Sequence, residues 1–209
     1  AGHICLSVYS SGGFRQLGNA TKPIHVPGDM KGLKWRTTKS PVEFMLVKNW
    51  GATPTPYDWS QLYSGLQSGV VEGQYVASPW QHVAKLHEVA KYFTEIGGMW
   101  SGNILAMDAK QYNALSSQEK KWLHEAADAY GEKVNQLDNA WIKNGEDAIK
   151  ASAKEWYVPS EAEMSKWREG AIGAWLDAKG TFEPEVAKRV LLEQGMDGFV
   201  AQLEKAGAL

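Results

Sequence analysis

One uninterrupted helical pattern, from Ser117 to about Ser152, constrains the fold of this chain more than any other feature. Large or apolar side chains recur in it at spacings of three and four residues, which places them on one face of a helix: Trp122, Ala126, Tyr130, Val134, Leu137 and Trp141. A helix of this length is about three times the mean for globular proteins. We therefore expect it to span more than one domain.

The remainder of the chain has short apolar runs that are typical of strands. They are separated by amphipathic segments and by glycine-rich or proline-rich turns. The run at 4–9 ends in Ser10-Ser11-Gly12-Gly13, which predicts a tight turn. The predicted strands are residues 4–9, 33–37, 70–76, 104–107 and 156–158.

Helix starts are marked by capping residues. Ser40 is a predicted N-cap followed by Pro41 at the first helical position. Asp58 is expected to cap the next helix, with Gln61 completing a capping box. Ser160 is predicted to cap a further helix, and Pro184 is predicted to open the last helix. In the first hundred residues strands and helices alternate, which predicts an α/β domain with a largely parallel sheet.

Composition excludes several classes of function. The net charge is −2 and the chain has no Lys/Arg-rich run, so we expect no nucleic-acid partner. Cys5 is the only cysteine and the five histidines form no HxxxH or HxH pair, so we expect no bound metal and no internal disulfide. No GxSxG, GxxxxGK[ST] or GxGxxG motif is present, so we expect neither a cofactor nor an enzyme.

Arg36 stands out among the polar residues. It lies in a short apolar strand just before a helix start, and ligands of open α/β sheets bind beyond the carboxyl ends of strands. An Arg at this place presents a planar fork of donors that matches a carboxylate. The alternative is a structural Arg paired with a nearby Asp or Glu. Strand alternation places Trp35 on the opposite face, in the core.

Four segments resemble motifs of the substrate-binding proteins of TRAP transporters. Residues 27–36 (PGDMKGLKWR) are similar to the DLKGLKxR signature of that family, and residues 51–56 (GATPTP) to its GAxPTPM stretch. Residues 60–74 (SQLYSGLQSGVVEGQ) resemble xEVYxALQxGVVDGQ, and residues 85–92 (KLHEVAKY) resemble KxYEVxKY. The motifs occur in the family's order and at its spacing.

The resemblance implies a fold of the periplasmic binding protein type, with two α/β lobes, a ligand cleft and a long connecting helix. It assigns residues 1–101 to the second lobe, 102–140 to crossing segments and part of the first lobe, and 141–209 to a helical part packing on the second lobe. The first lobe is expected to be largely missing from this chain, and so is the signal peptide. A periplasmic location, delivery of a small organic acid to a TRAP membrane permease and a monomeric full-length protein are further expectations.

The family's binding residues fall on particular positions of this sequence. Its carboxylate-binding Arg corresponds to Arg36, and a second Arg, which contacts ligand in some members, corresponds to Arg15. The aromatic or apolar cleft position that follows PTPM corresponds to Trp59. Trp100 and Asn103 flank the crossover near Gly102 and are candidates to reach the ligand.

One departure from the family pattern concerns the ligand. Where many members have DGQEN, this chain has EGQYV, so Val76 replaces an Asn that helps to hold the carboxylate. Valine cannot donate a hydrogen bond. Either the ligand is less polar at that end, or Tyr75 or Lys39 takes over. With Tyr75 and Trp59 as walls, we expect a monocarboxylate with an apolar or aromatic body rather than a sugar acid.

Two other readings of the same α/β cleft stay open at this point. The chain could be a sensing module that reports a ligand to a membrane partner, or an enzyme. The sensing module would differ from a transport receptor in its partner rather than in its pocket. The missing catalytic motifs count against an enzyme.

Overall fold

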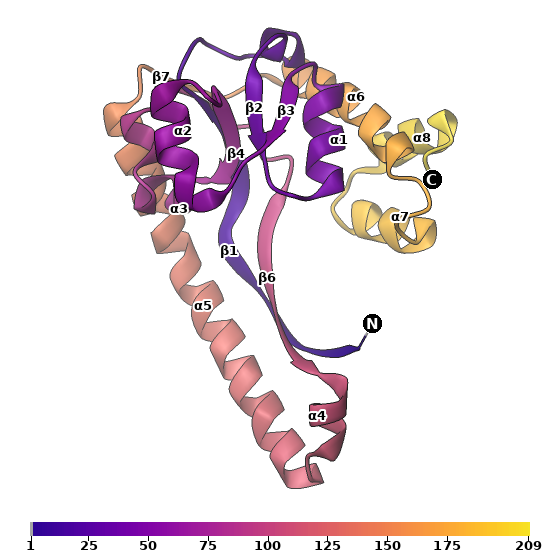
Figure 1. Cartoon of the computed structure of the whole chain (residues 1–209). Helices are drawn as coiled ribbons and strands as arrows, with labels where there is room; N and C mark the ends of the chain where they lie inside the picture. The colour runs from indigo at the N-terminus through magenta and orange to yellow at the C-terminus, as the bar shows by residue number, and fades with distance from the viewer. Residues whose placement is uncertain (1) are drawn as a thin grey trace. The chain divides into compact units, whose positions relative to one another are not determined.

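The computed structural model describes residues 2–209, which form two compact units (Figure 1). Unit 1 contains the described residues through Gln16, together with Val76–Lys85 and Gly97–Ser152. Unit 2 contains Leu17–Tyr75, Leu86–Ile96 and Ala153–Leu209. The predicted boundaries at 101 and 140 concern the lobes of a longer protein and stay a prediction. The long helix lies entirely within unit 1.

Unit 2 is built on a mixed sheet with the strand order β3-β2-β4-β1-β5-β7. β3 and β4 are parallel to β2, and β7 is parallel to β5, whereas β1 and β5 are antiparallel. The strands are the end of β1 (His3–Asn19), β2 (Lys34–Thr37), β3 (Thr53–Pro56), the start of β4 (Gly73–Ala77), β5 (Tyr92–Thr94) and β7 (Glu155–Tyr157). The antiparallel β1 makes the sheet less parallel than the sequence predicts.

The helices of unit 2 include α1, beside β2 and β3, and α6, which packs against α1 (Figure 1). The full set is α1 (Pro41–Asn49), α2 (Leu62–Ser68), α6 (Glu161–Asp177), α7 (Pro184–Glu193), α8 (Asp197–Ala206) and the 3-10 turns η1 (Pro27–Met30), η2 (Trp59–Gln61) and η3 (Leu86–Glu88). The predicted caps Ser40 and Ser160 are confirmed, since each side chain accepts a hydrogen bond from the third residue of its helix.

Two predictions about helix ends in unit 2 are wrong. The Asp58 side chain makes no cap hydrogen bond with the described residues, because a 3-10 turn separates it from α2. Pro184 does not open the last helix. Gly195, at φ 70°, ends α7 in a left-handed conformation that glycine tolerates, and α8 follows.

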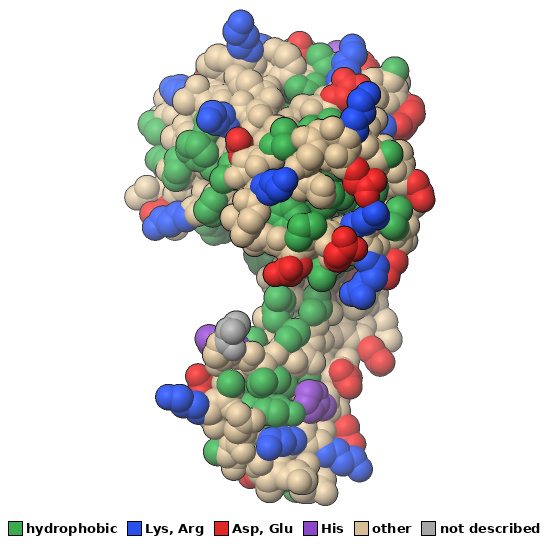
Figure 2. Space-filling model, turned by 90° about the vertical axis from the view of Figure 1, so that its right-hand side faces the viewer, with side chains coloured by type: hydrophobic (Ala, Val, Ile, Leu, Met, Phe, Trp, Pro, Cys, Tyr) green, Lys and Arg blue, Asp and Glu red, His purple; other side chains and the backbone are tan. Residues whose placement is uncertain are grey.

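Unit 1 contains the part of β1 up to Gln16, which is paired with β6 (Trp100–Asp108) in an antiparallel ribbon. Three helices accompany it: α3 (Ser78–Val83), α4 (Ala109–Ala114) and α5 (Ser117–Ser152). The predicted extent of the long helix is confirmed. Figure 2 shows hydrophobic side chains at the surface around α4 with charged and histidine side chains beside them, and a mixture of hydrophobic and charged side chains on the rest of that face.

The predicted tight turn at Ser10–Gly13 is absent from the described chain, where β1 continues through these residues with an irregularity. Gly12 and Gly13 have φ of 91° and 69°. This left-handed backbone, which glycine adopts readily, forms an irregularity in the strand rather than a turn. Asp138 of α5 holds the irregularity in the strand, because it accepts hydrogen bonds from Ser10 Oγ at 2.5 Å and from Gly12 N at 2.9 Å. A contact 128 residues away thus decides the local conformation.

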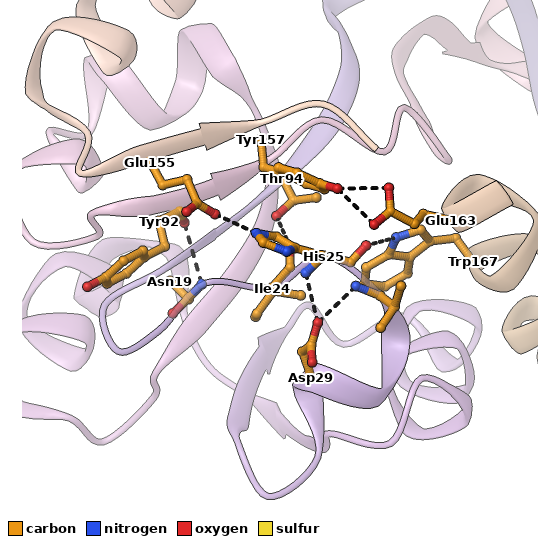
Figure 3. Close-up of polar contacts among 11 residues, drawn as sticks. Asn19, Ile24, His25, Asp29, Tyr92, Thr94, Glu155, Tyr157, Glu163 and Trp167 are labelled. Atoms are coloured by element: carbon orange, nitrogen blue, oxygen red, sulfur yellow. Dashed lines mark hydrogen bonds and ion pairs between the residues drawn. The ribbon is translucent and has the colours of Figure 1, made fainter. Parts of the chain in front are cut away.

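A polar network in unit 2 joins the segment around His25 to β7 and α6 (Figure 3). His25 Nε2 lies 2.8 Å from Glu155 Oε1, and the His25 ring stacks on Tyr157 with a centroid distance of 3.8 Å. The Tyr157 hydroxyl lies 2.8 Å from both carboxylate oxygens of Glu163, and Trp167 Nε1 donates to the His25 carbonyl at 3.0 Å. These contacts fix the start of α6 against the sheet.

The lowered pKa of the Glu163 carboxyl group predicts that the stability of the protein depends on pH. Hydrogen bonds from the Ser160 side chain and backbone, and then from Tyr157, lower the pKa of Glu163 to about 2. Because the folded pKa is below the unfolded value of about 4.3, the stabilisation is present above that value and is lost as pH falls toward 2. Glu163→Gln should therefore lower the melting temperature at pH 7, and the difference from wild type should shrink between pH 4.5 and about 2.

Thermal unfolding monitored by circular dichroism across that pH range tests this prediction. Glu132→Gln is the matched control, since Glu132 is exposed on α5. Glu132→Gln should show no such convergence. A Glu163→Gln difference that stays constant from pH 7 to pH 2 would contradict the assignment.

Candidate functional site

The candidate site lies at the carboxyl end of β2 in unit 2. β3 and β4 run parallel to β2, so all three strands end at the same edge of the sheet. Arg36 is the penultimate residue of β2, and Thr37 beside it is paired with Pro56, the last residue of β3. This is the edge at which ligands of open α/β sheets bind.

Arg36 is held in a defined position. Its Nε donates a hydrogen bond to the Tyr57 carbonyl at 3.1 Å, and its guanidinium carbon lies 5.9 Å from the centroid of the Trp59 ring. Arg36 is 5% exposed, whereas Trp59 is 40% exposed. The structure thus brings the predicted cation and the predicted aromatic wall together. Trp35 is fully buried on the other face of the strand, as alternation predicts.

The loop between β2 and α1 is fixed by a residue that the sequence reasoning missed. Glu43 is 1% exposed, and its Oε2 accepts hydrogen bonds from Thr38 N at 3.0 Å and Thr38 Oγ1 at 2.5 Å. The available signal was the Ser40-x-x-Glu43 spacing of a capping box. The backbone that follows Arg36 is therefore tied to the first turn of α1.

Tyr75 does not form the exposed wall that we expected. It lies in β4, the neighbour of β2, but its side chain is fully buried and packs edge-on to Trp50 at a centroid distance of 5.6 Å. The ring faces the core because Trp50 and the helices that cover this side of the sheet provide an apolar surface. Val76, the next residue, is 8% exposed and begins the second segment of unit 1.

The remaining predicted site residues belong to unit 1. Arg15 is half-buried on β1, and its backbone N–H donates to the Met99 carbonyl at 2.8 Å. Trp100 is 46% exposed on β6 and pairs across the ribbon with Phe14. Asn103 is exposed and pairs with Tyr9. Their roles as ligand contacts stay predictions.

The chemistry available at the β2 edge is recognition of an anion. A buried guanidinium forms strong charge-assisted hydrogen bonds with a carboxylate, and the aromatic ring beside it offers a flat apolar surface. Within residues 2–209, no group of three or more His, Cys, Asp or Glu side chains is placed to hold a metal ion. None of the helices in that range is long and apolar enough to cross a membrane.

Comparison with models of protein families identifies the family of the chain. Residues 1–180 match the DctP model, whose description is bacterial extracellular solute-binding protein, family 7. The chain belongs to this family. Family 7 is a family of solute-binding proteins rather than of enzymes.

Curated relatives match this chain over part of their own length. TeaA, the ectoine-binding periplasmic protein of Halomonas elongata, is 29% identical over 150 residues, which are 72% of this chain and 43% of TeaA. A solute-binding protein of Verminephrobacter eiseniae is 32% identical over 129 residues, 61% of this chain and 38% of the relative. The chain thus spans about two fifths of the curated relatives it matches.

Solved structures confirm the predicted α/β fold of the periplasmic binding protein type. The ectoine-binding protein of the Halomonas elongata TeaABC TRAP transporter has a TM-score of 0.77 at 26% identity, covering 98% of this chain and 65% of that protein. A TRAP periplasmic solute-binding protein of Roseobacter denitrificans with bound β-D-glucuronate has a TM-score of 0.79 at 20% identity, with coverages of 97% and 62%. The second likeness concerns the fold alone.

Proposed function

We propose that this family-7 chain is part of a periplasmic receptor that captures a small organic acid through Arg36 and delivers it to a TRAP membrane permease, without catalysing a reaction. The observation that carries the proposal is the placement of Arg36. Its guanidinium is buried at the carboxyl end of β2, oriented by the Tyr57 carbonyl and adjacent to the half-exposed Trp59. Membership of a solute-binding family supports the same conclusion.

The names of the relatives support a small carboxylate-type ligand and a periplasmic location. TeaA and UehA are ectoine-binding periplasmic proteins, and YiaO of Escherichia coli is a 2,3-diketo-L-gulonate-binding periplasmic protein. Structures of similar fold contain L-galactonate or L-malate. The relatives therefore favour an organic acid, but they do not determine the chemistry of the rest of the ligand.

Within that class we propose a monocarboxylate with an apolar or aromatic body. Trp59 offers an exposed ring beside the guanidinium, and Val76 cannot supply the hydrogen bond that a polar residue would. A sugar acid loses many hydrogen bonds to water on binding and needs directed partners in return. Because Tyr75 is buried, the apolar surface in unit 2 depends on Trp59 rather than on both rings.

A thermal-shift screen tests the ligand class. Benzoate and cyclohexanecarboxylate should raise the melting temperature, while glucuronate and galacturonate should not. A ligand present at 100 times its Kd stabilises by about 2.7 kcal/mol, which corresponds to roughly 5–10 °C for a protein of this size. Stabilisation by the hexuronates with none by the apolar acids would contradict the proposed class, and no stabilisation by any organic acid would contradict the proposed function.

A further inference from the structure

A hollow lies beyond the ends of β2 and β3, close to Arg36 along the chain but not lined by it. This hollow has a volume of about 250 Å³ and is lined by Thr38, Lys39, Ser40, Pro41, Phe44, Met45 and Pro56. Arg36 and Trp59, which are both described in the structure, are not among its lining residues. The hollow therefore has its own surface, separate from the proposed carboxylate contact at Arg36.

The wall of the hollow is apolar because of helical spacing. Pro41, Phe44 and Met45 stand at positions i, i+3 and i+4 of α1, which share one face of a helix. Pro56 at the end of β3 adds a further apolar side, and Phe44 is 39% exposed. An exposed aromatic ring in a concave, proline-lined surface offers contact area for an apolar group.

The rim of the hollow is polar and carries a positive charge. Lys39 is exposed, and within residues 2–209 its ammonium makes no hydrogen bond or ion pair. Thr38 is clamped by the buried Glu43, so the backbone that presents Lys39 is tied to α1. The hollow is thus formed by fixed backbone, with a flexible cation at its edge.

We propose that this hollow is a second small-molecule site, separate from Arg36, which binds a compact apolar monoanion. The apolar body lies against Pro41, Phe44, Met45 and Pro56, and the anionic group meets Lys39. The volume equals that of about eight water molecules in the liquid, which suits a body the size of a single six-membered ring. A polyhydroxylated acid is disfavoured, since the apolar wall cannot replace the water that its hydroxyl groups lose.

Methyl NMR of the purified protein tests the site with benzoate as the probe. The chain has six methionines, and Met45 lines the hollow, so labelling methionine methyl groups gives one reporter and five internal references. The Met45 signal, assigned with Met45→Leu, should shift in a saturable way with benzoate. Benzamide, the neutral isostere, and gluconate should shift it much less at equal concentration.

Variants identify which part of the surface binds. Phe44→Ala should weaken benzoate binding about tenfold, because it removes an apolar contact that buries about half of the phenylalanine ring. Lys39→Ala should weaken it about fivefold, since the charge is at the surface. The matched controls are Val42→Ala and Lys48→Ala, which remove an exposed apolar and an exposed cationic residue from the same helix outside the hollow. Both controls should bind benzoate like wild type.

Arg36→Ala separates this proposal from the proposed function. The Met45 response to benzoate should survive in folded Arg36→Ala protein, whether or not Arg36 holds a carboxylate elsewhere. Loss of the response in Arg36→Ala would show that the hollow is only an extension of the Arg36 site and would overturn the proposal. An absent response in wild type, or equal responses to benzoate and benzamide, would overturn it as well.

Discussion

Replacement of Arg36 by alanine should abolish binding of the organic acid at the β2 edge while the protein remains folded. The guanidinium is 5% exposed and oriented by the Tyr57 carbonyl, so a carboxylate that reaches it pairs with it in a weakly screened environment. Removing one partner of such a pair costs about 3–5 kcal/mol, which corresponds to a loss of affinity of roughly two to three orders of magnitude or more. Calorimetric titration of wild type and variant measures the loss.

Arg36→Lys should recover only part of the affinity, because the lysine ammonium keeps the charge and loses the bidentate fork. Arg189→Ala is the control, as it removes an arginine whose side chain is 72% exposed on α7. Arg189→Ala should bind the acid like wild type. If Arg36→Ala instead unfolded the protein, the alternative of a structural ion-paired arginine would be favoured. If it bound with unchanged affinity, the clamp would be excluded.

Trp167→Ala should cause a large loss of stability in unit 2. Trp167 is 2% exposed, donates from Nε1 to the His25 carbonyl at 3.0 Å and packs edge-on to Trp50 at 5.1 Å (Figure 3). Truncation of a buried tryptophan costs about 3–5 kcal/mol. For a protein of this size, that lowers the melting temperature by roughly 6–20 °C.

Differential scanning calorimetry compares this variant with Trp122→Ala, in which the lost ring is 59% exposed on α5. The control should change the free energy of unfolding by no more than about 0.5 kcal/mol. Equal melting temperatures for Trp167→Ala and wild type would mean that α6 is not anchored through this ring. A large effect of Trp122→Ala would mean that the exposed face of α5 is covered in solution.

The elements that the sequence predicts well are those with local causes. The helix from Ser117 to Ser152 follows from apolar spacing alone, and the start of α6 follows from the Ser160 cap. β2 follows from a short apolar run between a glycine and a helix start. In each case, the residues that determine the structure are close together in sequence.

Two of the wrong predictions involve contacts between residues that are distant in sequence. Ser10–Gly13 has the composition of a turn, but Asp138 holds it as an irregularity within β1. Tyr75 has a polar tip suited to a cleft, yet Trp50 gives its ring an apolar partner inside unit 2. Local sequence patterns do not identify partners that are distant in sequence.

The candidate site was predictable in part. Arg36 is conspicuous as a cation in an apolar strand, and the family resemblance assigned it a role before the geometry was known. Its orientation by the Tyr57 carbonyl could not be predicted, because that contact depends on how β3 leaves the sheet. The Ser40-x-x-Glu43 spacing is typical of a capping box, in which the Glu43 carboxylate would accept from Ser40 N, whereas in the structure this carboxylate accepts from Thr38.

The most direct test of the central claim is a calorimetric titration with a matched pair of compounds. The pair is the organic acid that raises the melting temperature most and its neutral primary amide, each titrated into wild-type protein. If Arg36 recognises a carboxylate, the acid should bind at least about 100-fold more tightly than the amide, since only the carboxylate forms charge-assisted hydrogen bonds with the guanidinium. Equal affinities for the acid and the amide would contradict the account.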